Sequence, residues 1–382
     1  MAATASGAAG KHGEGRGATR PTEIPVNGWK DVLWRVYAEI GKDRVTLIAA
    51  GVTYYLLLAL VPGLTALISL YGFFADPATI TEHLQALNGF VPAGGMDILR
   101  EQVTRLASTQ ESTLGFAFLL SLAVALWSAN AGVKSLFEAM NVAYDEVEER
   151  SFIKLNLVSL FFTFCMLVAA LLLIGSAVVV PIVLQFLPLG NALQWAIGAV
   201  AAVLTLLVLS FGVAALYRWG PSRAQAKWRW ITPGAILTLV VTAIVSVLFS
   251  WYAANFGSYN ATYGSLGALV GFMTWIWLTM LILIVGGELN SELEHQTARD
   301  STTGREERLG RRGATMADRI AGGADPDHDL ADRSQGGAHR DGEPAPARTR
   351  GERRPEPISF GRLAVAVPAA FILSWAHKRG GR

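Results

Sequence analysis

Four long stretches of the chain contain no charged residue. They cover residues 45–75, 112–133, 155–217 and 230–287, and they are 31, 22, 63 and 58 residues long. One helix needs about 20 apolar residues to cross a hydrocarbon core about 30 Å thick. The first two stretches therefore predict one membrane-spanning helix each, and the last two predict two helices each. Solid apolar runs argue against a β-barrel, whose strands alternate apolar and polar residues.

Helix-breaking residues mark a turn inside each of the two longest stretches. Residues 187–191 read Leu-Pro-Leu-Gly-Asn, and residues 255–260 read Asn-Phe-Gly-Ser-Tyr-Asn. We therefore expect an all-α fold, a polytopic membrane bundle of six transmembrane helices. The expected spans lie near 46–74, 112–133, 155–186, 193–217, 231–252 and 265–286.

Basic residues near the span ends predict the orientation, because Lys and Arg accumulate on the cytoplasmic side. Eleven of them precede the first span or lie in the loops after the second and fourth spans, and the opposite loops hold only Arg100 and Arg105. We expect a multi-pass protein of the bacterial cytoplasmic (inner) membrane, with the amino terminus and the end of the sixth helix in the cytoplasm. The first span is too long for the apolar region of a cleavable signal peptide, so we expect it to remain as an anchor.

The predicted membrane domain covers residues 28–297 and follows a polar, Gly/Ala-rich segment, 1–27, that we expect to be disordered. Just before the first span, residues 29–42 carry apolar side chains at steps of three and four, which predicts an amphipathic helix. This helix either lies on the cytoplasmic membrane surface or packs against the ends of the bundle.

The carboxyl-terminal part divides into two segments. Residues 299–357 hold twelve Arg and twelve Asp or Glu, so we expect 298–357 to be a disordered tail of balanced charge. That balance argues against a nucleic-acid-binding arm, which needs a positive excess. Residues 358–382 contain an apolar run of 14 that is short for a span, and we expect an interfacial helix there rather than a seventh crossing.

The chemistry-bearing residues disfavour an enzyme. The single cysteine, Cys165, lies inside an apolar run and excludes an intramolecular disulfide. None of the six histidines lies in an expected span or has a metal-ligand partner at helical spacing. We also find no phosphate-binding glycine loop and no nucleophile beside a base. We therefore expect no catalytic residues, no cofactor and no metal.

Three segments together resemble the YihY/BrkB family of bacterial inner-membrane proteins, once mislabelled ribonuclease BN. The segments are 49–62, which reads AAGVTYYLLLALVP, 126–152 with its Leu-Trp-Ser start, and 249–290 with its Gly-Gly-Glu-Leu-Asn end. The resemblance covers residues 28–297 and departs at Gly220-Pro221-Ser222, where the family usually has Pro-Asn. It implies a six-helix, virulence-factor-like membrane protein and identifies no biochemical activity.

The first span carries candidate pathway residues. Thr53, Tyr54 and Tyr55 lie near its middle, and Pro62 removes a backbone donor and bends the helix. Polar groups and broken helices at this depth are typical of transporters. The alternative is a packing kink whose tyrosine hydroxyls bond to neighbouring helices.

A second candidate set lies at the cytoplasmic ends of the second and sixth spans. Its members are Asn130, Lys134, Glu138 and Asn141 on one helix face, with Glu288 and Asn290 after two glycines. We hypothesise that Glu288 meets the face of Lys134 and Glu138 and forms a polar gate. The alternative is an ion-pair network that only fixes the helix ends.

The outer turn between the fifth and sixth spans carries Asn255, Tyr259 and Tyr263. These side chains either contact a substrate or anchor the turn at the membrane interface, as aromatic residues commonly do.

The function expected from these features is transport or translocation of a small solute or a lipid-like molecule. The alternative is a non-catalytic scaffold for envelope proteins. Ribonuclease activity is disfavoured, because acidic metal ligands, histidine pairs and a basic groove are missing from the sequence pattern. The expected partners are the lipid bilayer and a small-molecule or lipid substrate, without nucleic acid. An envelope protein partner or a homo-oligomer is left open.

Overall fold

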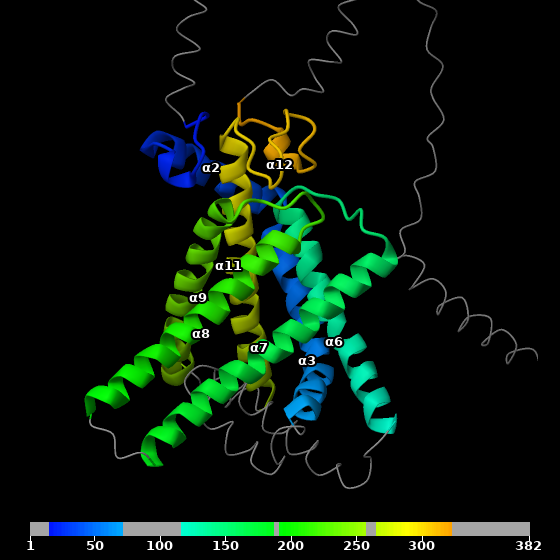
Figure 1. Ribbon diagram of the computed structural model, residues 1–382, viewed down its shortest axis with the longest axis vertical. Coiled ribbons are helices and arrows are strands. Elements are labelled where there is room, and N and C mark those ends of the chain that lie inside the picture. The colour runs from blue at the N-terminus through cyan, green and yellow to red at the C-terminus, as the bar shows by residue number, and fades with distance from the viewer. Residues whose placement is uncertain (1–14, 72–115, 187–190, 257–264, 323–382) are drawn as a thin grey trace, which may run out of the picture. The chain divides into compact units, whose positions relative to one another are not determined.

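The computed structural model describes residues 15–71, 116–186, 191–256 and 265–322 (Figure 1). These residues form helices that are joined by loops. Within them, β-type pairing is limited to one isolated antiparallel bridge between Ala226 and Thr302. The all-α fold class predicted from the apolar runs is confirmed.

Six long helices occur within the described ranges, at the positions of the six expected spans. They are α3 (Val45–Tyr71), α6 (Phe116–Ala143), α7 (Phe152–Phe186), α8 (Asn191–Trp219), α9 (Trp228–Phe256) and α11 (Ser265–Gln296). In the part of the chain that the structure describes, five of them are long and apolar enough to cross a membrane, and α6 is the sixth long helix. The chain is therefore a multi-pass membrane protein.

Two of these helices run about ten residues beyond the expected spans. The spans were expected to end at 133 and 286, whereas α6 continues to Ala143 and α11 continues to Gln296. The first charged side chain ends an apolar run but not a helix, because the backbone hydrogen bonds of a helix do not depend on apolar side chains. The extensions matter because they carry seven of the buried polar residues, six of them on α11.

The bundle core lies around α11, which packs against α9, α3, α2 and α6 (Figure 1). Small residues let α9 and α11 approach closely at one crossing. A Cβ atom added at Gly234 would lie 2.0 Å from the carbonyl oxygen of Gly286. Near the same crossing, the Tyr217 hydroxyl lies 2.6 Å from the Thr238 hydroxyl and donates to the Leu283 carbonyl at 2.7 Å. Such close backbone contact is a usual means of joining helices in lipid, where apolar burial gives little driving force.

Helices α7 and α8 contact each other and expose large apolar side chains. On α8 alone, the exposed apolar residues include Leu193, Trp195, Val200, Val203, Leu204, Leu206, Leu207, Leu209 and Phe211. An apolar surface of this length is expected to contact hydrocarbon rather than water. The outward faces of the bundle therefore contact the lipid bilayer.

The segment before the first long helix contains η1 (Pro21–Glu23) and α2 (Val26–Lys42). Val32 and Val36 of α2 are buried in a cluster with Trp230 of α9 and Leu293 of α11. On another side of α2, Leu33, Trp34 and Tyr37 are exposed. The amphipathic helix therefore packs against the bundle, which is one of the two expected placements, and leaves an aromatic face exposed.

Residues 298–322 differ from the disordered tail expected from 298 onward. They form a hydrogen-bonded segment that contains the short helix α12 (Thr315–Asp318). The backbone N–H groups of Ala224, Lys227 and Thr303 join it to the loop between α8 and α9 by bonds of 2.8 Å each. Composition averaged over the whole tail misses this segment, because its polar groups find their partners on a distant loop. Residues 323–382, which hold the rest of the tail and the expected interfacial helix, lie outside the described residues.

The segment 15–27 is likewise packed, although the sequence predicted disorder for 1–27. Ala18 and Ile24 are buried against α2 and α11, and the Arg16 carbonyl accepts from the Ala298 N–H at 2.9 Å. Residues 1–14 lie outside the described residues.

Candidate functional site

Four segments that are distant in the sequence meet at the carboxyl-terminal end of α11, drawn at the top of Figure 1. They are residues 15–44, 144–150, 218–229 and 297–322. Glu292 pairs with Arg35 of α2, and Glu146 accepts from the Thr315 N–H at 2.7 Å. The segments that the sequence predicted to share one side of the membrane thus lie together, and we call them the polar end.

The polar end contains a cavity of about 90 Å³ between the end of α2, the end of α6, α11 and α12. This volume accommodates several water molecules. Its walls are rich in acidic side chains: Glu39, Asp43, Asp145, Glu288 and Glu292 line it together with His295. Lys42 and Arg319 add basic groups, and Met316 of α12 is an apolar part of the lining.

Glu288 is the most unusual of the cavity residues. It is 2% exposed, and its Oε1 atom has no hydrogen-bond partner within the described structure. The preceding Gly287 allows α11 to lie against α6, because a Cβ atom there would be 3.1 Å from the Ala143 Cβ. Close packing of small residues thus buries a carboxyl group at the base of the extension of α11.

The carboxyl group of Glu288 lies within hydrogen-bonding reach of that of Asp43, which follows the end of α2, and both residues line the cavity. Burial and the nearby Glu39 carboxylate raise the pKa of Asp43 above its ordinary value. Two acidic residues from distant parts of the chain therefore share one contact.

Glu292, one turn after Glu288, has basic partners instead. The Arg35 Nε atom lies 2.5 Å from its Oε2 atom, and the His295 Nδ1 atom lies 3.3 Å from the same oxygen. Arg35 also donates to the Gln296 side chain at 2.7 Å. This network attaches α2 to α11 beside the cavity.

A second buried ion pair joins the α8–α9 loop to α11. The Arg223 Nη2 atom lies 2.6 Å from the Glu294 Oε2 atom, and both side chains are almost completely buried. The Ser301 hydroxyl donates to the same oxygen at 2.5 Å, and the Arg223 guanidinium lies 5.0 Å from the ring centre of Tyr144. Burial opposes the charge on Arg223, but Glu294 outweighs it and raises the pKa of Arg223.

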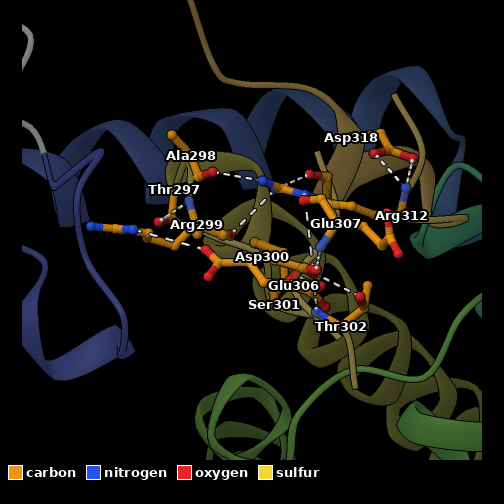
Figure 2. Close-up of polar contacts among 12 residues, drawn as sticks. Thr297, Ala298, Arg299, Asp300, Ser301, Thr302, Glu306, Glu307, Arg312 and Asp318 are labelled. Carbon is orange, nitrogen blue, oxygen red and sulfur yellow. Dashed lines mark hydrogen bonds and ion pairs between the residues drawn. The ribbon is translucent and has the colours of Figure 1, made fainter. Parts of the chain in front are cut away.

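The segment after α11 is organised by Arg312, Asp300 and Asp318 (Figure 2). Arg312 donates to the backbone carbonyls of Ala298 at 2.7 Å and Ala317 at 2.6 Å. Asp300 accepts from the backbone N–H groups of Thr302 and Glu307 at 2.8 Å each, and Asp318 accepts from the Arg312 N–H at 3.0 Å. We call residues 297–322 the cap, because Met316 and Arg319 within it line the cavity.

The hydrogen bonds to Asp300 also affect its ionisation. Burial favours the neutral carboxyl, but the donated N–H and hydroxyl bonds outweigh burial and lower the pKa of Asp300. Asp300 therefore stays ionised as an anchor of the cap, in contrast to Asp43.

The candidate residues of the first span do not converge on an interior path. The Thr53 hydroxyl donates to the Ala49 carbonyl of its own helix at 2.7 Å. Tyr54 and Tyr55 are 55% and 48% exposed and lie on the outside of α3 with their rings in edge contact. Pro62 lies within α3 and is half-buried.

The candidate residues of α6 form contacts other than those expected. Lys134 donates to the Asn156 side chain of α7 and lies over the Trp127 ring at 5.4 Å. Asn130 is buried and accepts from the Thr163 hydroxyl at 3.3 Å, whereas Glu138 is exposed.

The structure does not bring Glu288 to Lys134 and Glu138, so the expected gate contact is wrong. Glu288 meets Asp43 instead. The reason is that Lys134 faces α7, while Glu288 faces the turn between α2 and α3.

Two candidate amides fix backbone positions. Asn141 accepts from the Ser222 N–H at 2.7 Å and donates to Glu148 at 3.1 Å. Asn290 accepts from the Gly234 N–H at 2.8 Å. In the outer turn, Tyr259 and Tyr263 lie outside the described residues, and so does the side chain of Asn255.

The sequence reasoning did not single out Asp43, Glu292 and His295. Their spacing held a signal, since Glu288, Glu292 and His295 follow one another at steps of four and three along one helix face. What could not be read from spacing is that this face packs against the end of α2. Among the described residues, no group of three or more His, Cys, Asp or Glu side chains is arranged to hold a metal ion.

Comparison with known proteins gives one family. The profile of the Virulence factor BrkB family matches residues 36–310, which include much of the cap. A ribonuclease-like protein of Bacillus subtilis, YfkH, is 32% identical over 249 residues, which are 64% of this chain and 88% of that protein.

Two UPF0761 membrane proteins are also similar. The protein of Chromohalobacter salexigens is 28% identical over 247 residues, covering 63% of this chain and 58% of the relative. The protein of Vibrio atlanticus is 26% identical over 260 residues, covering 66% and 79%. No solved structure matches the chain.

Proposed function

The chain belongs to the Virulence factor BrkB family of multi-pass membrane proteins, and on that premise we propose that it moves a small solute or a lipid-like molecule across the bacterial inner membrane. The observation that carries this proposal is Glu288, a buried carboxyl group with an unpartnered oxygen at the wall of an acidic cavity. A buried carboxyl group without a basic partner is energetically unfavourable, and groups of this kind cluster at functional sites.

The cavity opens to the cytoplasm in this proposal. Most of the basic residues that flank the expected spans lie in the segments of the polar end, including Arg35, Arg150 and Arg218. The positive-inside rule assigns such an end to the cytoplasmic side.

Directly beyond the cavity, apolar residues close the proposed path. Val45 and Ala49 of α3, Phe137 and Met140 of α6, and Ile284 of α11 are buried together in one cluster. A solute would pass only after α3, α6 and α11 separate, as transporters do when they alternate between two sides. The conformation described is therefore closed at this layer.

The same cluster supports the second candidate function, a scaffold for envelope proteins. A bundle whose core is apolar between α3, α6 and α11 resists opening, and the folded cap presents an ordered surface next to the membrane. In that function the carboxyl groups would serve only to join α2 and the cap to the bundle.

Enzymatic activity is not proposed. One relative is described as ribonuclease-like, but the cavity is lined by Glu39, Asp43, Asp145, Glu288 and Glu292. Five acidic side chains disfavour a polyanion such as RNA, which is bound mainly through basic residues.

The test is a flux assay with the full-length protein in liposomes, using fluorescent phospholipids and pH- and sodium-sensitive dyes. We expect protein-dependent flux of one class and its loss in Glu288→Gln, which keeps the size of the side chain. Glu149→Gln is the matched control, because Glu149 is exposed in the α6–α7 loop and does not line the cavity.

Two results separate the candidates. Flux that persists in Glu288→Gln would show that the cavity is not part of the transport path. No flux for any class with folded protein would contradict transport and leave the scaffold, whose partners are then sought by crosslinking through the cap.

A further inference from the structure

The contact between Asp43 and Glu288 constrains the protonation of these two carboxyl groups. An ionised carboxylate has only acceptor oxygens, so two of them cannot form a hydrogen bond with each other. Two carboxyl groups that face each other in the wall of one cavity form a stable contact only if one of them carries a proton. Two ionised carboxylates in direct contact would instead repel each other.

Other acidic groups around the cavity have basic partners. Glu39 lies 2.8 Å from the Lys42 ammonium, and Asp145 lies 3.1 Å from the Arg319 guanidinium. Glu292 is paired with Arg35 and His295, as described above.

The ion pairs recorded in the described part of the chain do not include Asp43 or Glu288. Lys42 is the nearest basic neighbour in its effect on Asp43, and it is outweighed by burial and by Glu39. Basic side chains therefore do not neutralise the negative charge of Asp43 and Glu288, so a small cation must do so.

We propose that Asp43 and Glu288 form a proton-binding pair, which holds one proton between the two carboxyl groups and exchanges it with water in the cavity. The exchange route that we propose is the Oε1 atom of Glu288, because this atom is buried without a partner in the described structure and its residue lines the cavity. The inference rests on the proposed function in one respect, because it identifies the proton as the ion that is coupled to the proposed transport.

Release of the proton leaves two negative charges in contact. The proton passes from the carboxyl group to a cavity water, and the Asp43–Glu288 hydrogen bond is lost at the same time. The two elements that this bond joins are the α2–α3 turn and α11. Repulsion between the two carboxylates would loosen that attachment, which connects proton exchange to the helices that must separate for transport.

The test is an infrared pH titration of the full-length protein in phospholipid vesicles. A protonated carboxyl group absorbs at a C=O frequency that an ionised one lacks. Above about pH 6, ordinary Asp and Glu side chains are ionised and do not contribute to this band. We expect a carboxyl band that persists above this pH and disappears as the pH is raised further.

The assignment is made with three variants. The band should be lost in Glu288→Gln and in Asp43→Asn, and it should remain in the exposed control Glu149→Gln. Thermal unfolding of each variant verifies that it is folded. A titration without such a band, or a band retained in both cavity variants, would overturn the proposal. Loss of the band on adding sodium at constant pH would also overturn it, and would indicate a sodium site.

The measurement needs no substrate, so it fails separately from the proposed function. A titrating band in a protein that transports nothing would support the pair and contradict transport. Flux that is unchanged by pH and retained in Asp43→Asn would support transport and overturn the proton as its coupling ion.

Discussion

The last turns of α11 and the outer surfaces of α7 and α8 have opposite distributions of polar and apolar side chains. From Glu288 to Thr297, nearly every residue of α11 and its end is buried, and most of them are polar or charged. Along α7 and α8, large apolar side chains such as Phe161, Leu172 and Leu206 are exposed. A water-soluble protein has the reverse distribution.

This difference indicates which contacts stabilise the folded protein. Apolar side chains that face lipid gain little from packing against another helix, because hydrocarbon is as apolar as the helix surface. The polar end joins α2, the α6–α7 loop, the α8–α9 loop, α11 and the cap by ion pairs and hydrogen bonds that are largely buried. We therefore expect substitutions at the polar end to act strongly and substitutions on the outer face of α8 to act weakly.

The largest effect is expected from breaking the buried pair of Arg223 and Glu294. Arg223→Met should lower the free energy of unfolding by about 3–5 kcal/mol, because it leaves Glu294 buried without its partner. Thermal unfolding in detergent measures the loss. The matched control is Arg319→Met, whose pair with Asp145 is about half exposed and should contribute at most about 1 kcal/mol. Equal losses in the two variants would contradict the contrast between buried and exposed pairs.

The next effect is expected at the crossing of α9 and α11. Gly234→Ala places a Cβ atom 2.0 Å from the Gly286 carbonyl oxygen and 2.5 Å from the Asn290 amide nitrogen. Backbone atoms must move, and we expect a loss of about 3 kcal/mol, measured by thermal unfolding. Gly212→Ala on α8 is the control, because no atom lies within 4 Å of the added carbon. If Gly212→Ala destabilises as much, another chain covers α8.

The pH dependence should differ between two acidic residues of the polar end. The pKa of Asp43 is raised by burial and by Glu39. The folded state then binds more protons than the unfolded state, so the contribution of Asp43 falls as the pH rises from its ordinary pKa to its folded pKa. Asp43→Asn should therefore raise the unfolding temperature at neutral pH and flatten its pH dependence.

The stability that Glu148 contributes should change with pH in the opposite direction. Burial favours its neutral form, but hydrogen bonds from Arg150 and Asn141 outweigh burial and lower the pKa of Glu148. Its contribution is present above its ordinary pKa and is lost as the pH falls through the folded pKa. Glu148→Gln should lower the unfolding temperature at neutral pH, with less difference from wild type in acid. The same response in both variants would contradict these assignments.

The smallest effect is expected on the outer face of α8. Leu206→Ala removes an exposed apolar side chain and should change the free energy of unfolding by less than about 0.5 kcal/mol. Thermal unfolding at two protein concentrations measures it. A larger loss that depends on protein concentration would show that a second copy of the chain covers this face.

The long helices were predictable from the sequence, whereas the site was predictable only in part. Apolar runs located the helices because each run is a local property of the chain. Glu288 was a candidate, since a carboxyl group after two glycines at a span end is unusual. Its assignment to Lys134 and Glu138 was wrong, because side-chain spacing on one helix does not say which other helix that face meets.

The ordered cap was also missed for a physical reason. Its balanced charges and its glycines are typical of disorder. In the structure, two of these charged residues are buried, with Arg312 bonded to carbonyls and Asp300 to N–H groups. Composition counts charges but does not locate their partners.

The apolar runs are sufficient to show that the chain is helical, lies in a membrane and crosses it several times, because hydropathy is a local property of the chain. The packing of the helices was needed to show that Asp43 lies beside Glu288 and that Arg223 pairs with Glu294. It was also needed to show that Tyr54 and Tyr55 face outward. The reason is that the energies of charges depend on distance and burial, which arise only when helices that are distant in the sequence pack together.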